Sequence, residues 1–110
     1  MKPEQIRELL ESTHSANPKV RRASILQLCP CDVRTNLSGI WDRILEMQHD
    51  EDAGVRSIVF HNLCDGSPHD RHDEVIAAVE LLANDRDKKL RRRARNALAV
   101  YRRTGVINQE

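Results

Sequence analysis

The sequence predicts an all-α fold, a short α-solenoid in which three antiparallel helix pairs stack side by side. A seven-residue segment occurs at residues 15–21, 50–56 and 85–91, two steps of 35 residues without a gap, and a fixed period of this size is typical of stacked repeats. Charged residues make up 32% of the chain and aromatic residues 3%, a composition that suits helices. No long segment alternates β-branched or aromatic residues with polar ones, so we expect no sheet.

The repeats divide the chain without leaving room for a second domain. We predict a single domain over residues 1–110, with repeats at about 3–30, 36–65 and 69–104. No apolar run approaches the roughly 18 residues of a membrane span, and the first residues lack the apolar core of a signal peptide. Three cysteines are an odd number, which argues for a reducing compartment. We therefore expect a soluble, cytoplasmic protein with no membrane contact.

Proline and apolar spacing predict two helices in the first repeat. Pro3 suits the first turn of a helix, and Ile6 and Leu10 follow at helical spacing. Asn17 suits the N-cap of the next helix, with Pro18 at its first position. We expect the inner face of that second helix to consist of Val20, Ala23, Ser24, Gln27 and Leu28.

The second and third repeats follow the same plan. Asp52 and Asp87 suit the N-caps of their second helices, and Asp70 or Asp73 suits the N-cap of the third repeat's first helix. Gly105 is a helix stop, and we expect residues 106–110 to be a frayed tail. The apolar positions predicted to face the core include Trp41, Ile44, Leu63, Val79 and Leu98.

The turn between the two helices of a repeat carries a family resemblance. The pattern Asp-x-Asp-x-x-apolar-Arg at residues 50–56 and 85–91 resembles that of HEAT repeats, and the first copy departs from it with Ser15 and Asn17 in place of the two acids. The resemblance covers residues 3–104. It implies three HEAT-like repeats, a fold that serves mostly as a binding scaffold and, in a minority of members, as a bilin lyase or a binder of alkylated DNA.

The same resemblance implies a structural role for one arginine in each repeat, Arg21, Arg56 and Arg91. In HEAT repeats this arginine braces adjacent turns by pairing with the acid six residues earlier, here Asp50 and Asp85. Because Ser15 leaves Arg21 without its own acid, we expect Arg21 to reach Asp50 of the next layer. A planar guanidinium with five donors suits this role.

Cysteine and histidine residues raise the question of a metal. Cys29, Cys31, His61 and Cys64 are candidate zinc ligands. However, the paired Cys-x-x-Cys spacing is missing, the ligands come from different layers, and a free cysteine is often a small buried hydrophobe. We therefore expect neither a metal nor a cofactor.

Charge is distributed unevenly along the chain. Residues 1–85 contain 9 Lys and Arg against 15 Asp and Glu, a net charge of −6, whereas residues 86–110 contain 9 against 2, a net charge of +7. The basic last helix is interpreted either as a polar cap that ends the stack or as a surface for an anionic partner. The candidate partner-binding residues are Arg22, His61, Arg92, Arg93, Arg95, Arg102 and Arg103.

These observations favour a non-catalytic scaffold that binds another protein, and the basic last helix leaves an acidic partner open. Nucleic-acid binding through the last helix is the alternative, although the scarcity of aromatic residues disfavours recognition of single-stranded bases. Head-to-tail self-association between the acidic and basic ends is also open. Enzyme activity ranks third, because the acid–base groups Asp70, His72, Asp73 and Glu74 stand in a loop and helix start without a nucleophile.

Overall fold

The computed structural model describes residues 1–30 and 38–109, and in these residues the chain is all-helical, with six α-helices and no strand. The α-helices are α1 (Pro3–Ser12), α2 (Pro18–Gln27), α4 (Ser38–Glu46), α5 (Ala53–Leu63), α6 (His72–Leu82) and α7 (Lys88–Thr104). Two short 3₁₀ helices, η1 (Met47–His49) and η2 (His69–Arg71), follow α4 and precede α6. None of the helices in this part of the chain is long and apolar enough to cross a membrane.

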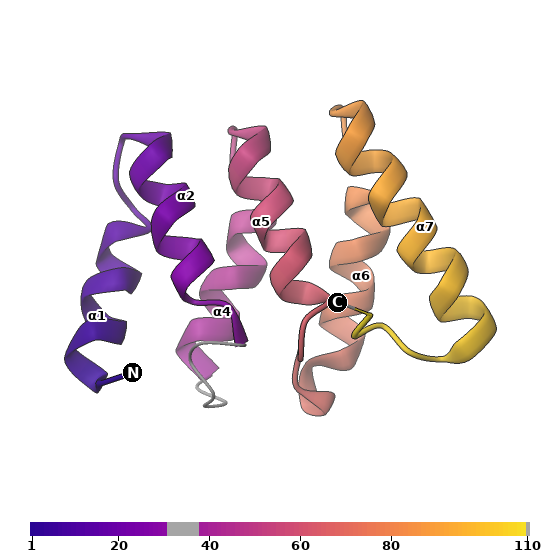
Figure 1. Cartoon of the computed structure of the whole chain (residues 1–110), viewed down its shortest axis with the longest axis horizontal. Coiled ribbons are helices and arrows are strands. Elements are labelled where there is room, and N and C mark those ends of the chain that lie inside the picture. The colour runs from indigo at the N-terminus through magenta and orange to yellow at the C-terminus, as the bar shows by residue number, and fades with distance from the viewer. Residues whose placement is uncertain (31–37, 110) are drawn as a thin grey trace.

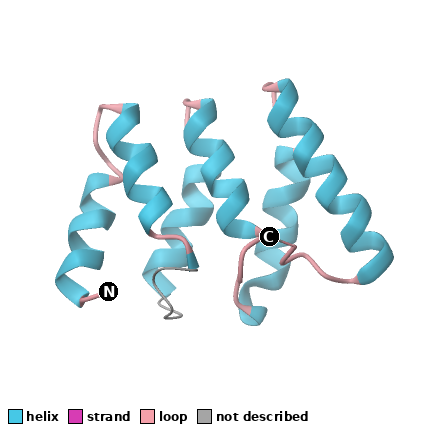
Figure 2. Cartoon of the chain, in the orientation of Figure 1, coloured by secondary structure: helices cyan, strands magenta, loops and turns pink. Residues whose placement is uncertain are grey.

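The helices pack mainly on their neighbours. Helix α1 contacts α2, α4 contacts α5, and α6 contacts α7 (Figure 1). Helix α5 also packs against α2, α6 and α7, and α4 packs against α6. In Figure 2 the described residues consist of helices and connecting loops. Helix α5 therefore lies beside both α2 and α7.

The three predicted N-caps of the second helices are confirmed. The side chain of Asn17 accepts a hydrogen bond from the Lys19 amide at 3.0 Å. The carboxylate of Asp52 accepts from the amide three residues later at 2.9 Å, and that of Asp87 does the same at 2.9 Å. Each cap satisfies an amide that has no partner within its helix, so these starts are set by local sequence.

The start of α6 differs from the prediction. Arg71 occupies the N-cap position and forms no side-chain cap, so neither Asp70 nor Asp73 caps this helix. Residue 70 instead lies within η2, which leads directly into α6. The Arg71 side chain is turned toward α4, where its Nη2 lies 2.8 Å from Asp42 Oδ1. The Arg71 side chain thus forms an ion pair with α4 and does not cap its own helix.

The buried face of α2 is rotated relative to the prediction. Arg21, Ile25 and, as predicted, Ser24 and Leu28 are buried. Three residues expected inside are exposed, namely Val20, Ala23 and Gln27. Helix α2 is in contact with both α1 and α5. The buried residues of α2 therefore pack against two neighbouring helices. They include Arg21, a charged residue that its polarity would place on the surface.

The last residues are packed onto the molecule, so the predicted frayed tail is wrong for residues 106–109. Gly105 has a φ of 73° and ends α7 in the left-handed conformation. The chain then turns back, Ile107 is buried with 4% exposure, and Asn108 Oδ1 accepts hydrogen bonds from the amides of Gly66 and Ser67 at 2.9 and 2.8 Å. The C-terminal segment consequently returns toward the end of α5 (Figure 1).

The hydrophobic core runs through all six helices. Leu63 of α5 is fully buried, and the single tryptophan, Trp41 of α4, is 3% exposed. The largest fully buried apolar side chains are Ile25, Leu28, Ile44, Met47, Leu63, Leu82 and Leu90. Since these side chains come from α2 and its C-cap, α4, η1, α5, α6 and α7, burial of apolar surface is the main term that holds the helices together.

Candidate functional site

Two arginines connect successive helix pairs by the same bidentate ion pair. Arg21 Nε lies 3.0 Å from Asp50 Oδ2, and its Nη2 donates to Oδ1 at 3.1 Å. Arg56 repeats this arrangement with Asp85, at 2.9 and 3.0 Å. A fork-to-fork pair of this kind is stronger and more directional than a single hydrogen bond. We call the series Arg21, Asp50, Arg56, Asp85 and Arg91 the arginine ladder.

Each ladder arginine also binds the turn that precedes its own helix. The Nη1 atom of Arg21 donates to the carbonyls of Ser15 and Ala16, at 2.9 and 3.2 Å. The Nη1 atom of Arg56 donates in the same way to the carbonyls of residues 50 and 51, at 2.8 and 3.1 Å. One edge of the guanidinium thus holds its own turn, and the other edge holds the turn of the next layer.

The direction of pairing confirms one prediction and corrects another. Arg21 pairs with Asp50, as expected. The expected pairing of Arg56 and Arg91 with the acids six residues earlier is wrong, because each of these arginines contacts only the backbone carbonyl of that acid. Arg56 pairs instead with Asp85. The physical reason is geometric: the Asp50 carboxylate points toward the preceding layer, where it meets the guanidinium of Arg21.

Contacts in the ladder shift the pKa values of two of its members, Asp85 and Arg21. Burial by itself would raise the pKa of Asp85, but hydrogen bonds from Arg56 and from the Asp87 amide, together with the Arg56 charge, hold this pKa below its ordinary value of 3.8. The hydrogen bond to Asp50 raises the pKa of Arg21. For Asp85 and Arg21, the direction of each pKa shift favours the charged form.

Arg91 stands at the open end of the ladder. Its Nη1 atom donates to the carbonyl of Asp85 at 2.9 Å, as the other two arginines do in their own turns. Within the described residues, however, no carboxylate takes the place that Asp50 and Asp85 occupy beside Arg21 and Arg56. The side chain of Arg91 is half-buried. The ladder thus ends in a guanidinium that is held in position on one edge only.

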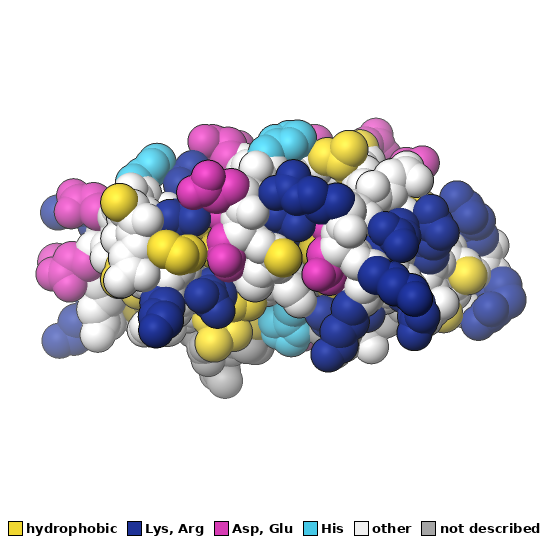
Figure 3. All heavy atoms as spheres, turned by 90° about the horizontal axis from the view of Figure 1, so that it is seen from above, with side chains coloured by type: hydrophobic (Ala, Val, Ile, Leu, Met, Phe, Trp, Pro, Cys, Tyr) yellow, Lys and Arg dark blue, Asp and Glu magenta, His cyan; other side chains and the backbone are white. Residues whose placement is uncertain are grey.

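The surroundings of Arg91 are strongly basic. We define the basic α7 surface as the exposed side chains of Lys88, Lys89, Arg92, Arg95, Arg102 and Arg103. Lys and Arg side chains gather at the α7 end of the molecule (Figure 3). A hollow of about 250 Å³ is lined by Lys88, Arg91, Arg92, Arg95 and Asn96. Asp87 at the helix start is the only acid among residues 86–109.

Three predicted partner-binding arginines make contacts within the protein. Arg95 Nε donates to the Ala83 carbonyl at 2.8 Å. The guanidinium of Arg93 lies 4.9 Å from the ring centroid of Phe60, and its Nη1 donates to Ser57 Oγ at 2.8 Å. The expectation that Arg93 faces outward is therefore wrong, because its side chain joins α7 to α5. Arg22 Nε lies 3.3 Å from Asp52 Oδ2 of the next layer, and the Arg22 side chain remains 41% exposed.

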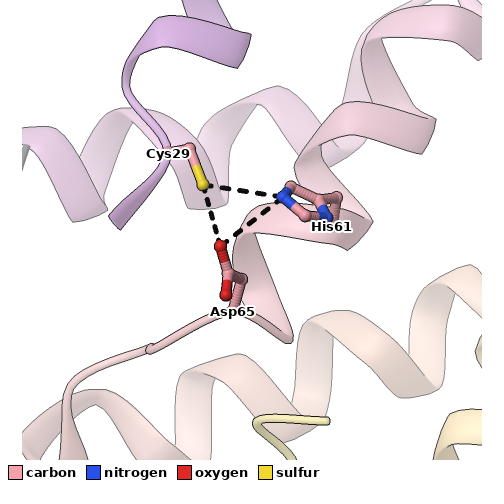
Figure 4. Close-up of side chains that lie close together, drawn as sticks. All are labelled: Cys29, His61 and Asp65. Atoms are coloured by element: carbon pink, nitrogen blue, oxygen red, sulfur yellow. Dashed lines mark hydrogen bonds and ion pairs between the residues drawn. The ribbon is translucent and has the colours of Figure 1, made fainter. Parts of the chain in front are cut away.

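A second cluster lies between α2 and α5, where Cys29, His61 and Asp65 turn their side chains toward one another (Figure 4). Cys29 Sγ lies 3.6 Å from His61 Nε2 and 3.0 Å from Asp65 Oδ2. The same Nε2 atom lies 3.5 Å from that Oδ2. Three ligand atoms of types that bind zinc therefore converge on one point.

The cluster contains only part of the set that the sequence suggested. Cys29 and His61 were candidates, and Asp65 was missed. Its signal was the i, i+4 spacing from His61, which places both side chains on one side of a helix end. Cys64 is buried in the hydrophobic core, with 1% exposure. Cys31 lies outside the described residues.

The acid–base residues of η2 and of the first turn of α6 border a shallow hollow of about 550 Å³. It is lined by His69, Asp70, His72, Asp73 and Glu74, none of which is a nucleophile of the Ser, Thr or Cys type. The three acids are exposed, and His72 Nε2 lies 2.8 Å from the Tyr101 hydroxyl, which joins α6 to α7. This arrangement is typical of solvated charges with one structural contact.

Fold and site together define an all-helical protein in which arginine–aspartate ion pairs join α2 to the turn before α5 and α5 to the turn before α7, and in which α7 carries a basic surface. The sequence matches no protein-family model, and the comparisons with curated proteins and with solved structures likewise find no match.

Proposed function

We propose that this chain is a short HEAT-like α-solenoid that acts as a non-catalytic scaffold and binds an acidic segment of a partner protein through α7. The HEAT-like assignment is supported by the recurrence of equivalent contacts at a spacing of 35 residues. Arg21 binds Asp50 and Arg56 binds Asp85 through the same atoms. Such regularity is expected when one supersecondary unit is stacked repeatedly.

The open end of the arginine ladder is the observation that carries the binding proposal. In both earlier layers the Nε and Nη2 atoms of the ladder arginine hold an aspartate carboxylate. Arg91 lines a hollow that is rich in Lys and Arg. A carboxylate from a partner therefore fits where the next layer's aspartate would stand. The surrounding cations would favour a segment with several acids and speed its encounter.

Binding of nucleic acid is the second candidate, and the charge of the basic α7 surface favours it. Six exposed cations on one helix suit contacts with phosphates, which require charge but no particular carboxylate geometry. A protein partner fits better because Arg91 is oriented by its own turn for bidentate contact.

The remaining candidates receive less support. Head-to-tail self-association would bring the basic α7 surface to the exposed Glu4, Glu8 and Glu11 of α1. In the ladder register, however, Arg91 would meet Ser15, which has no carboxylate. A bilin-lyase activity would need an accessible thiol. Cys29 and Cys64 are each 1% exposed, and Cys31 lies outside the described residues.

The test is a titration of a fluorescent aspartate-rich peptide, and separately of duplex DNA, at low and high salt. We expect peptide binding that weakens as salt rises. Arg91→Lys keeps the charge but loses the bidentate geometry, so peptide affinity should fall about 10-fold whereas DNA affinity should change little. Equal effects on both ligands would contradict the acidic-peptide proposal.

A matched pair of triple variants separates the α7 surface from total charge. Arg92, Arg102 and Arg103 changed to Gln remove three exposed cations of α7, and Lys2, Arg7 and Lys19 changed to Gln remove three exposed cations elsewhere. Only the first set should abolish peptide binding. Light scattering of the protein alone covers self-association: salt-sensitive association without peptide binding would overturn the proposal in favour of a head-to-tail contact.

A further inference from the structure

We propose that Cys29, His61 and Asp65 form a zinc site that joins the first helix pair to the second. The inference is independent of the proposed scaffold function, because the cluster lies between α2 and α5 and involves no residue of α7. Three features of the cluster support a zinc site: the separations of the ligand atoms, their position at two helix ends, and the approach of both other ligands to one nitrogen of His61.

The separations of the ligand atoms match those of a zinc centre. With metal bonds of about 2.3 Å to sulfur and about 2.0–2.1 Å to nitrogen and oxygen, tetrahedral angles require ligand separations of about 3.3–3.6 Å. The sulfur–nitrogen and nitrogen–oxygen distances are 3.6 and 3.5 Å. The sulfur–oxygen distance is 3.0 Å, that of a thiol donating to the carboxylate, and a small rotation of the Asp65 side chain would widen it on metal binding.

The histidine is used as a ligand would be and not as the middle member of a catalytic relay. In a nucleophile–His–acid relay the two imidazole nitrogens face different partners, one the nucleophile and one the acid. Here both Cys29 Sγ and Asp65 Oδ2 approach the same atom, Nε2 (Figure 4). The three atoms therefore surround a common point, where a cation would neutralise the thiolate and the carboxylate.

The backbone around the cluster also favours a cation. Cys29 follows the end of α2, at Gln27, and His61 and Asp65 flank the end of α5, at Leu63. The C-terminal end of a helix carries partial negative charge and carbonyls without a helical partner. Two such ends meet here. The side chains of His61 and Asp65 are 35% and 21% exposed, so an ion can enter from solvent, whereas the sulfur lies at the buried base.

A bound ion would act as a clip between layers. Cys29 precedes His61 by 32 residues and Asp65 by 36 residues. Binding would therefore be coupled to the packing of α2 on α5. Since ligands must be deprotonated to bind, affinity should fall as pH is lowered. Three protein ligands leave the tetrahedron to be completed by a further ligand such as water.

The experiment measures zinc binding to chelator-treated protein by competition with a chromophoric chelator. One zinc ion per chain is expected, with a higher melting temperature in its presence. Cys29→Ser, His61→Gln and Asp65→Asn should each weaken binding by at least about 100-fold, because loss of even an outer-sphere partner costs about 10–100-fold. The matched controls Cys64→Ala and His69→Gln should bind as the unmodified protein does.

A second measurement does not depend on whether the variants fold. Cobalt(II) added to the unmodified protein should give an absorption band from thiolate-to-metal charge transfer and the visible bands of tetrahedral coordination, and zinc should displace both. Absence of these bands, or zinc affinity that survives in all three ligand variants, would overturn the proposal. Loss of affinity in the controls as well as in the ligand variants would assign binding to another site and overturn it equally.

Discussion

The second and third turns of the ladder carry the same sequence pattern but differ in what surrounds them. Arg56, in the middle of the molecule, is 4% exposed and binds its own turn, at the Asp50 and Glu51 carbonyls, and the carboxylate of Asp85 in the next layer. Arg91, at the end, is half-buried and binds only its own turn within the described residues. The arginine at this position of the pattern therefore joins two turns in the middle of the molecule, whereas at the end it holds only its own turn within the described residues.

The difference separates two kinds of contact made by these arginines. Some are formed with the turn before the arginine's own helix, and others need the turn that follows. The N-cap aspartates and the contacts of Nη1 with turn carbonyls are formed within each unit. The contacts of Nε and Nη2 are formed only where another layer follows. Equivalent substitutions in the middle and at the end of the molecule should therefore change the free energy of unfolding by unequal amounts.

The largest effect is expected from truncating a core leucine in the middle layer. Leu63 of α5 is fully buried, and α5 packs against α2, α4, α6 and α7. Leu63→Ala should lower the free energy of unfolding by about 2–5 kcal/mol. Leu98→Ala in α7 should cost about 1–3 kcal/mol, because the end helix has fewer neighbours and its leucine is already 5% exposed. Chemical denaturation of both variants checks this, and a larger loss at Leu98 would contradict the comparison.

An intermediate effect is expected from replacing ladder arginines by lysine. Arg56→Lys keeps the charge but loses the bidentate pair with Asp85, so the free energy of unfolding should fall by about 1–3 kcal/mol. Arg91→Lys should cost less than about 1 kcal/mol, because it loses a single hydrogen bond to a carbonyl. Urea titrations give both values. Equal losses would mean that the contact with the next layer adds nothing to the middle arginine.

The smallest and most specific effect concerns pH. The pKa of Asp85 is lowered in the folded protein, so between the ordinary value of 3.8 and the lower folded value the unfolded chain binds more protons. The stability from the Arg56–Asp85 pair is therefore present above about pH 4 and is lost as pH falls through the folded pKa. Unfolding curves over this acid range should show a shallower loss for Asp85→Asn than for the unmodified protein.

A charge-matched variant controls this last measurement. Asp73→Asn removes one carboxylate that is exposed and lies outside the ladder. It therefore reports the effect of changing net charge without touching an ion pair. Identical acid slopes for the unmodified protein and Asp85→Asn would show that the ladder does not contribute to the pH dependence of folding.

Features set by neighbouring residues were determined by the sequence itself. The helical character of the chain, the N-caps at Asn17, Asp52 and Asp87 and the helix stop at Gly105 all follow from residue type and local spacing. These features depend on contacts within about four residues, where the chain has few alternative conformations. The contact of Arg21 with Asp50 was also predicted, because the motif in the first repeat lacks its own acid.

Features that depend on how helices meet were decided by tertiary structure. The sequence did not show that Arg56 would choose Asp85, that Arg93 would lie over Phe60, that Ile107 would be buried, or that Asp65 would join Cys29 and His61. Most of these contacts join residues some 29–36 positions apart. Their partners are fixed by the rotation of one helix face against another, and a change of a few ångströms in that packing would select a different carboxylate or a different ring.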